Sequence, residues 1–245
     1  MLDTNAFADA TLDPPGKIAV IGAGPIGIEA ALYGRFLGYD VTLYEAAEIG
    51  HSMRGRLEEP FPMMPHDALS PLAIAAIEAQ SGEKLPLALP MTYGQWIDQA
   101  LMKLVDGDLL RGRLKTHSRV TRIELLPLDV EGSPDEDSDP EEDTERGDIP
   151  PDFRLWIRSQ DDPAKVDAGL SIETESVIVA TGANCDIECE FHPPLEYFFR
   201  LGEASAATGD ESPSDYLARC RREITRVFAN LGGRADLDLY RPRRV

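Results

Sequence analysis

Three glycines and one glutamate have the types and the spacing to bind a dinucleotide. Gly22, Gly24 and Gly27 form a G-x-G-x-x-G pattern, and Glu45 follows Gly27 by eighteen residues. In this pattern the first glycine permits a tight turn, the second lets a diphosphate approach the backbone, and the third lets a helix pack closely on a sheet. A carboxylate at position 45 accepts hydrogen bonds from ribose hydroxyls and disfavours a 2′-phosphate, so NAD or FAD is favoured over NADP. The residues between the glycines are Ala23, Pro25 and Ile26.

The segments around this pattern indicate a β-α-β unit. We expect a strand over residues 17–21, a helix from about Pro25 to Leu37 that Gly38 ends, and a second strand over residues 40–45. The apolar period changes from strand to helix and back within about thirty residues, as in such units. A helix that begins at the glycine turn presents free N–H groups and a partial positive charge to phosphates. The alternative is a β-α-β unit that binds no ligand.

Strand patterns return in the second half of the chain. Residues 118–126 and 152–159 alternate apolar and polar side chains, which predicts half-buried strands. Residues 170–182 end in the apolar run from Val177 to Ala180, which predicts a strand covered on both faces. A further strand is expected over residues 197–202. Together these patterns predict an α/β protein with a parallel sheet and an added antiparallel meander.

Helix signals separate the strands. Residues 58–72 are rich in proline and methionine and are interpreted as a surface loop, whereas residues 71–80 predict a short helix. Thr92 and Gln95 fit a capping box at the start of a clearer helix. Ser212 is the expected N-cap of the last helix, which Gly232 ends. The chain is thus interpreted as one domain, residues 1–245, with a loose leader over residues 1–16 and a helical excursion at about 46–105.

The net charge of −20 is unevenly distributed. Residues 129–152 contain twelve acidic side chains and one arginine, and we expect a disordered loop there, with an interaction segment as the alternative. The overall charge repels nucleic acid. Since the chain has neither a run of eighteen apolar residues nor a signal-peptide pattern, we expect a cytoplasmic protein without a membrane span.

The motifs, taken in order, resemble a known family. IAVIGAGPIGIEAAL…VTLYE, VIVATGA and RLGEASA resemble the FAD-binding half of the pyridine-nucleotide-dependent flavin oxidoreductases, which include thioredoxin-reductase-like and flavin-monooxygenase-like enzymes. EIGHSMRG, FPMMPHDALSPL and LPMTYGQWIDQAL are similar to the middle of uncharacterised bacterial members. The resemblance covers most of residues 17–231 and implies a Rossmann-like FAD-binding fold.

The resemblance also assigns residues to the cofactor. In the family the glycine motif holds the ADP part of FAD, and Glu45 matches the residue that binds the adenosine ribose. The other implied contacts are the Val120 backbone to the adenine, Thr181 and Gly182 in the ATG turn beside the cofactor, Gly202 and Glu203 at the ribityl or pyrophosphate region, and Arg54, by analogy, at a phosphate.

A second glycine motif of the kind that binds NAD(P)H in this family does not occur in the sequence. The twenty residues from Gly182 to Gly202 are too few for a β-α-β unit of about thirty. The resemblance therefore implies a short member without the NAD(P)H domain. We expect an FAD-dependent oxidoreductase, to which NAD(P)H binds transiently or a partner delivers electrons. The alternative is a non-catalytic FAD- or nucleotide-binding module within a complex.

Other chemistry is less well supported by the sequence. Cys185 and Cys189 form C-x₃-C rather than the C-x-x-C of redox dithiols, and no Lys, Arg or His lies between them to lower a thiol pKa. His51 is either a proton-transfer group or a solvated loop residue. Met53, Met63 and Met64 are favoured as core residues over a lining of the flavin pocket. No metal site is expected, and no catalytic residue is assigned.

Overall fold

The computed structural model describes residues 16–81, 89–126, 152–159, 170–182, 186–192, 195–203 and 211–241. The expected leader, apart from Gly16, and most of the expected acidic loop lie outside the described residues. Among the described residues, no helix has the length and apolar character needed to cross a membrane.

The first sheet is parallel throughout. Its strand order is β3-β2-β1-β7-β9, and β1 pairs with β2 on one side and with β7 on the other. Val20 at its centre lies opposite Leu43 of β2 and Ile178 of β7. The strands are β1 (Lys17–Ile21), β2 (Asp40–Tyr44), β3 (Leu114–Lys115), β7 (Ser176–Val179) and β9 (Phe198–Arg200).

The second sheet is the antiparallel meander that the alternating patterns predict. Its order is β6-β5-β4-β8, with β4, β5 and β6 antiparallel and the short β8 parallel to β4. The alternate residues Phe153, Leu155 and Ile157 of β5 are buried. The strands are β4 (Ser118–Leu125), β5 (Phe153–Ser159), β6 (Leu170–Thr174) and β8 (Glu188–Cys189). The expected fold class, an α/β protein with a parallel sheet and an added meander, is confirmed.

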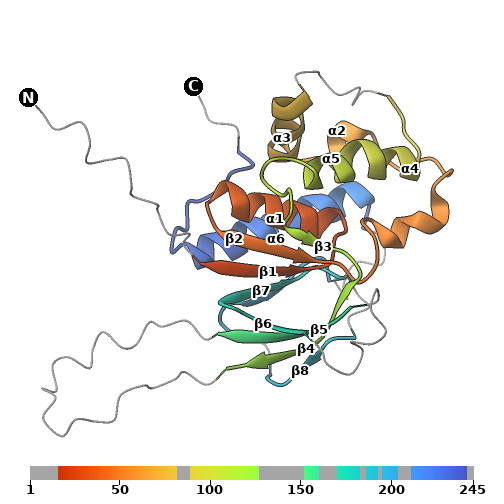
Figure 1. Cartoon of the computed structure of the whole chain (residues 1–245). Coiled ribbons are helices and arrows are strands. Elements are labelled where there is room, and N and C mark those ends of the chain that lie inside the picture. Colours follow the sequence, from red (N-terminus) through yellow and green to blue (C-terminus); the bar gives the residue numbers. More distant parts are fainter. Residues whose placement is uncertain are drawn as a thin grey trace, which may run out of the picture.

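The parallel sheet is covered on both faces, which explains its continuous apolar strands. Ile18 and Val20 join the core under the helices, whereas Ala19 and Ile21 join the core under the meander. Figure 1 shows α1 (Pro25–Phe36) and α6 (Pro213–Leu231) on one side of the sheet and the meander on the other. Because neighbouring strand residues point to opposite faces, both sets must be apolar.

The expected helix signals are present. The hydroxyl of Thr92 accepts from the Gln95 N–H at 3.2 Å, and the Gln95 side chain accepts from the Thr92 N–H at 3.0 Å. The hydroxyl of Ser212 accepts from the Asp215 N–H at 3.2 Å and caps α6. Gly38, with φ +93°, follows α1. The helix after Thr92 contains a π-helical section, which sequence reasoning missed, and comprises α4 (Tyr93–Trp96), η2 (Ile97–Leu101) and α5 (Met102–Val105).

The interpretation of residues 58–72 as a surface loop is wrong in part. A one-turn helix begins at Pro65, and Ala68, Leu69 and Ser70 are buried. Proline is tolerated in the first turn of a helix, so a proline-rich segment does not exclude one there. The remaining helices of the excursion are η1 (His51–Arg56), α2 (Pro65–Ala68) and α3 (Pro71–Ser81).

Glu29 is a buried acid on α1. Its side chain accepts a hydrogen bond from the Ser70 hydroxyl, and Arg221 of α6 lies near enough to act on it electrostatically. Arg221 in turn donates to the Ala68 carbonyl oxygen at 2.8 Å. Burial raises the pKa of Glu29 above its usual 4.5, more than these partners lower it.

We expect Gly27→Ala to destabilise the chain strongly. A Cβ at this position would lie 1.8 Å from the Gly22 carbonyl oxygen, so helix and strand would have to separate. The free energy of unfolding in urea should fall by about 2–4 kcal/mol. Gly55→Ala, where a Cβ meets nothing within 4 Å, is the control and should change it by less than about 0.5 kcal/mol. Equal effects of the two variants would contradict this packing.

The buried Glu29 also predicts a pH dependence of stability. A carboxyl with a raised folded-state pKa stabilises the fold fully below its unfolded pKa, and this contribution is lost as the pH rises through the folded value. As the pH rises above 4.5, the usual pKa of a glutamate, the free energy of unfolding of the wild type should therefore fall relative to that of Glu29→Gln. Urea unfolding of both proteins across this pH range measures the difference, and parallel stability curves would refute it.

Candidate functional site

A cleft of about 480 Å³ opens at the carboxyl ends of the central parallel strands. Its walls include Ile21 at the end of β1, Glu45 after β2 and Thr181 after β7. The chain moves from β1 to β2 on one side and later to β7 on the other, so β1 is the point where the strand order reverses. Open α/β sheets bind their ligands in the crevice at such a point.

The glycine turn leads from β1 into this cleft. Gly22 has φ +108°, and its N–H donates to the Tyr44 carbonyl oxygen at 2.7 Å. A Cβ on Gly22 would lie 2.7 Å from the Ala180 carbonyl oxygen, so the turn fits only glycine. Gly24 differs, because its φ of −77° suits any residue and a Cβ there would meet nothing within 4 Å. The protein itself does not require glycine at position 24, whereas a ligand close to the backbone would.

The N-terminus of α1 faces the cleft without a cap of its own. Gly24 is the N-cap residue, Pro25 follows it, and no side chain caps the first turn. No acidic residue lies in that turn. The first N–H groups of a helix have no partner inside it and carry a partial positive charge. Those of Ile26 and Gly27 are thus suited to bind an anion.

Glu45 is fixed by the backbone on both sides. One carboxylate oxygen accepts from the Ala23 N–H at 2.6 Å, and the other accepts from the Ala47 N–H at 2.9 Å. The residue is 9% exposed and still lines the cleft. Because each carboxylate oxygen has two lone pairs, Glu45 retains acceptor capacity for a ligand. Its contact with the glycine turn is a structural role that the sequence pattern did not indicate.

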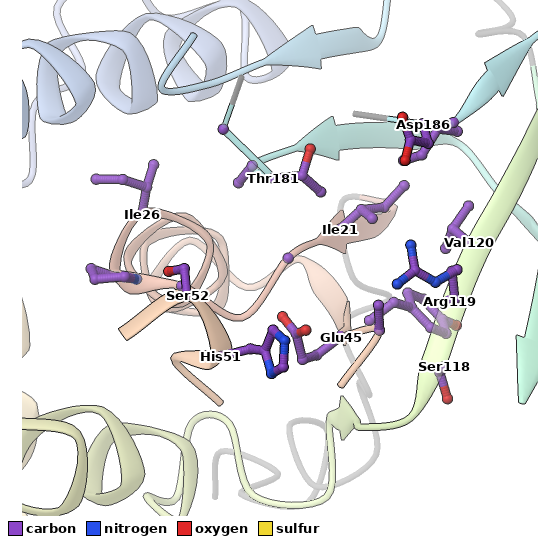
Figure 2. Close-up of a pocket in the computed structure, with 18 of the residues that line it drawn as sticks. Ile21, Ile26, Glu45, His51, Ser52, Ser118, Arg119, Val120, Thr181 and Asp186 are labelled. Carbon is purple, nitrogen blue, oxygen red and sulfur yellow. The ribbon is translucent and has the colours of Figure 1, made fainter. Parts of the chain in front are cut away.

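The two sides of the cleft come from distant parts of the chain. Figure 2 shows Ser118, Arg119 and Val120 of β4 on one side, Ile26 and Ser52 on the other, and Glu45 with His51 between them. Arg119 is exposed and makes no ion pair within the described part of the chain. It brings a positive charge to the side of the cleft that lies beside Glu45.

The structure brings most of the predicted site residues together. The predicted residues that line the cleft are Gly22, Gly24, Pro25, Ile26, Glu45, Val120, Thr181 and Gly182. Sequence reasoning missed Arg119, Ser52, Asp186, Tyr216 and Leu217, which also line it. The alternating pattern of β4 gave no sign of Arg119, because it predicts that neighbouring Arg119 and Val120 point to opposite faces of the sheet. Both line the cleft because β4 begins there, and the strand has a bulge between Val120 and Arg122.

The remaining predicted residues lie outside the lining. Arg54 pairs with Glu48 at 3.0 Å and donates to the Ile49 carbonyl oxygen at 3.1 Å. The Gly202 N–H donates to the Glu223 side chain at 3.1 Å, and Glu203 pairs with Arg200 at 3.1 Å. Ala23 gives its N–H to Glu45, and Gly27 packs against Gly22. Cofactor contacts by these residues remain predictions.

The cysteine, histidine and methionine residues considered from the sequence lie in different parts of the structure. Cys185 lies outside the described residues, so a pairing with Cys189 stays a prediction. His51 lines the cleft. Met53 is buried in the core under the helices, and Met63 packs against that core. Within the described ranges, no group of three or more His, Cys, Asp or Glu side chains could hold a metal ion.

Comparisons with known proteins give partial similarities. No protein-family model matches the chain. The NAD-dependent dihydropyrimidine dehydrogenase subunit PreT of Salmonella typhimurium and its homolog of Salmonella typhi are each 60% identical over 30 residues, 12% of this chain and 7% of the relative. The chain thus matches a small part of the length of these relatives.

The matches to solved structures also cover only part of the chains in those structures. Bacillithiol disulfide reductase Bdr from Bacillus cereus is similar over 76% of this chain and 47% of that one, with 15% identity and a TM-score of 0.44. An oxidized steroid monooxygenase bound to NADP is similar over 69% and 26%, with 21% identity and a TM-score of 0.43. At these TM-scores the likeness is partial, and the α/β architecture rests on the strand order and register given above.

We expect Glu45→Ala to destabilise the chain, because the Ala23 and Ala47 N–H groups lose a charged acceptor. The free energy of unfolding should fall by about 2–4 kcal/mol. Glu48→Ala is the matched control, since Glu48 is half-exposed and pairs at the surface with Arg54. That variant should lose less than about 1 kcal/mol. Chemical denaturation compares the two, and a loss at Glu45 no larger than at Glu48 would contradict this role.

Proposed function

We propose that the cleft binds FAD and that the chain is an FAD-dependent oxidoreductase. The observation that carries the proposal is the empty space at Gly24, beside the uncapped N-terminus of α1. Gly55 also has no such requirement, but Gly24 lies on the cleft wall at the start of α1, where the open space fits a ligand that approaches the backbone. The cleft volume of about 480 Å³ is within the usual range of about 300–1,000 Å³ for small-molecule sites.

The residues around the cleft fit the ADP half of such a cofactor. The N–H groups of Ile26 and Gly27 bind the diphosphate, and Glu45 accepts from the adenosine ribose with its remaining lone pairs. Glu45 repels a 2′-phosphate, which favours FAD or NAD over NADP. Val120 and Arg119 line the β4 side of the same cleft, where the adenine would lie. The positive charge of Arg119 on this side attracts a negatively charged cofactor to the cleft.

FAD is favoured over NAD by the later motifs. VIVATGA and RLGEASA resemble flavoproteins in their order after the glycine motif. Gly182 has φ +75°, lines the cleft, and leaves open space where a Cβ would lie, which supports a close approach of the cofactor there. When bound, FAD supplies hydride or electron transfer, and the protein supplies its position and electrostatic surroundings. The short identity with PreT, an NAD-dependent dehydrogenase subunit by name, supports a dinucleotide site and not a particular reaction.

A non-catalytic FAD- or nucleotide-binding module is the second candidate. It is supported by the spacing from Gly182 to Gly202, which leaves no room for a second β-α-β unit. For the oxidoreductase, the electron donor is then either NAD(P)H that binds transiently or a protein partner. His51, exposed in the cleft beside Glu45, is the candidate for proton transfer.

A substitution at Gly24 should weaken FAD binding without lowering the stability of the fold. Gly24→Ala should change the free energy of unfolding by less than about 0.5 kcal/mol, because a Cβ meets no protein atom. It should weaken FAD binding at least about tenfold, equivalent to about 1.4 kcal/mol, because the methyl group enters the space for the diphosphate. Titration of FAD, followed by quenching of flavin fluorescence, measures the affinity. Unchanged affinity in Gly24→Ala would refute the proposed seat of the diphosphate.

Anaerobic reduction separates the two candidate functions. NADH or NADPH is added to the FAD-loaded chain, and the flavin absorbance is recorded. Bleaching supports an oxidoreductase with a nicotinamide donor. Retained colour with both nucleotides supports the binding module or a protein donor. A chain that binds no FAD contradicts the oxidoreductase and the FAD-binding form of the module.

A further inference from the structure

A smaller chamber of about 140 Å³ adjoins the cleft. Pro25, Tyr216 and Leu217 line both spaces and therefore form their common wall. The inner wall includes Phe61, Met63 and Trp96 from the helical excursion. Ala68, Pro62 and Pro213 complete it, so carbon atoms form its accessible surface. The chamber is thus an apolar side pocket of the cleft.

Ring contacts hold the inner wall in place. Phe61 stacks on Trp96 with the ring centroids 4.7 Å apart and 12° between the planes. Tyr93 contacts Phe61 edge-on at 5.4 Å. Trp96 is only 1% exposed, so the surrounding core fixes its ring. The chamber is therefore formed before any ligand enters.

Tyr216 is fixed at the boundary between chamber and cleft. Its hydroxyl donates to the Gly202 carbonyl oxygen at 3.3 Å, and the Arg219 guanidinium lies 5.3 Å from its ring centroid. Burial raises the pKa of Tyr216 to about 12, which keeps the phenol neutral at physiological pH. Its ring thus adds neutral surface to the common wall, while its hydroxyl is hydrogen-bonded to the Gly202 carbonyl oxygen.

Size and chemistry define what the chamber can hold. For comparison of size, an enclosed apolar cavity of about 150 Å³ holds one benzene molecule. With a volume of about 140 Å³, the chamber suits a group of that size. A charged group would lose part of its hydration against this apolar wall without gaining a partner, which costs free energy.

The position of the chamber relates it to the proposed reaction. Glu45 marks the ribose end of the proposed dinucleotide, and the diphosphate lies at Gly24 and Ile26. The other half then extends past Pro25 toward Tyr216 and Leu217, where the chamber opens. We propose that the chamber binds a benzene-sized apolar group, an aromatic ring or a compact aliphatic group, of a small substrate whose reacting end lies in the cleft. This inference rests on the proposed function.

The test uses Trp96 as the reporter. The chain has two tryptophans, and Trp156→Phe removes the other, which lies on β5 and contacts Arg122 at 4.6 Å. Toluene and benzoate, which share one ring and differ in charge, are titrated into the full chain with and without FAD. Toluene should change the Trp96 fluorescence saturably, with a Kd at least about tenfold lower than that of benzoate.

Filling the chamber provides the matched variants. Ala68→Leu, at a buried wall position, and Met63→Phe, at a half-buried one, should each weaken toluene binding at least about tenfold. Ala75→Leu adds the same atoms at an exposed site on α3, outside the chamber lining, and should leave toluene binding unchanged. If Ala68→Leu does not fold, Met63→Phe decides. Equal affinity for toluene and benzoate, or full toluene affinity in the filled variants, would overturn the inference.

FAD titration of the same proteins keeps the two proposals distinguishable. The filled variants should bind FAD as the parent does, since neither substituted residue lines the main cleft. A chain that binds FAD but not toluene refutes the chamber alone. A chain that binds toluene with the expected selectivity but not FAD refutes the proposed function and the link to a substrate, while the apolar binding site stands.

Discussion

The structure of the site depends on the connection between the glycine turn and the end of β2. The Gly22 N–H donates to Tyr44, and the Glu45 carboxylate accepts from Ala23 and Ala47. These bonds hold the turn between β1 and α1 against the neighbouring strand, although Glu45 lies 22 positions after Ala23 in the sequence. Because the turn is fixed, the start of α1 is held at a constant position, with Gly24, Pro25 and Ile26 on the cleft wall. The acid that is proposed to bind the ribose thus also builds the loop that is proposed to bind the diphosphate.

The helical excursion supplies one side of the cleft and the inner wall of the chamber, which the β-α-β unit does not form. The β-α-β unit and β7 form the floor of the cleft, and β4 forms one side. Residues from η1 reach the other side, and Phe61 and Trp96 build the chamber next to it. The excursion also packs on the helices, since α2 contacts α6 and α3 contacts α1. One segment therefore contributes to the stability of the helical layer, to the cleft and to the chamber. Figure 1 shows its helices α2 to α5 on the same side of the parallel sheet as α1.

The sequence predicts the fold better than it predicts the site. Local periodicity is enough for β1, α1 and β2, for the alternating strands and for the caps at Thr92 and Ser212, because each pattern reflects contacts of nearby residues. The two-residue strands β3 and β8 are too short to show a period. The one-turn helix at Pro65 and the π-helical section depend on packing that no local pattern records. In the site, the glycines and Glu45 were found from spacing, whereas Arg119 and Tyr216 reach the cleft through contacts between distant segments.

A crystal structure of the chain soaked with FAD tests the central claim most directly. The account predicts a diphosphate oxygen within hydrogen-bonding distance, about 2.7–3.2 Å, of the Ile26 and Gly27 nitrogens. It also predicts the adenosine ribose hydroxyls on the Glu45 carboxylate, with the backbone bonds from Ala23 and Ala47 retained. A cleft that stays empty at saturating FAD, or FAD bound elsewhere on the chain, would contradict it.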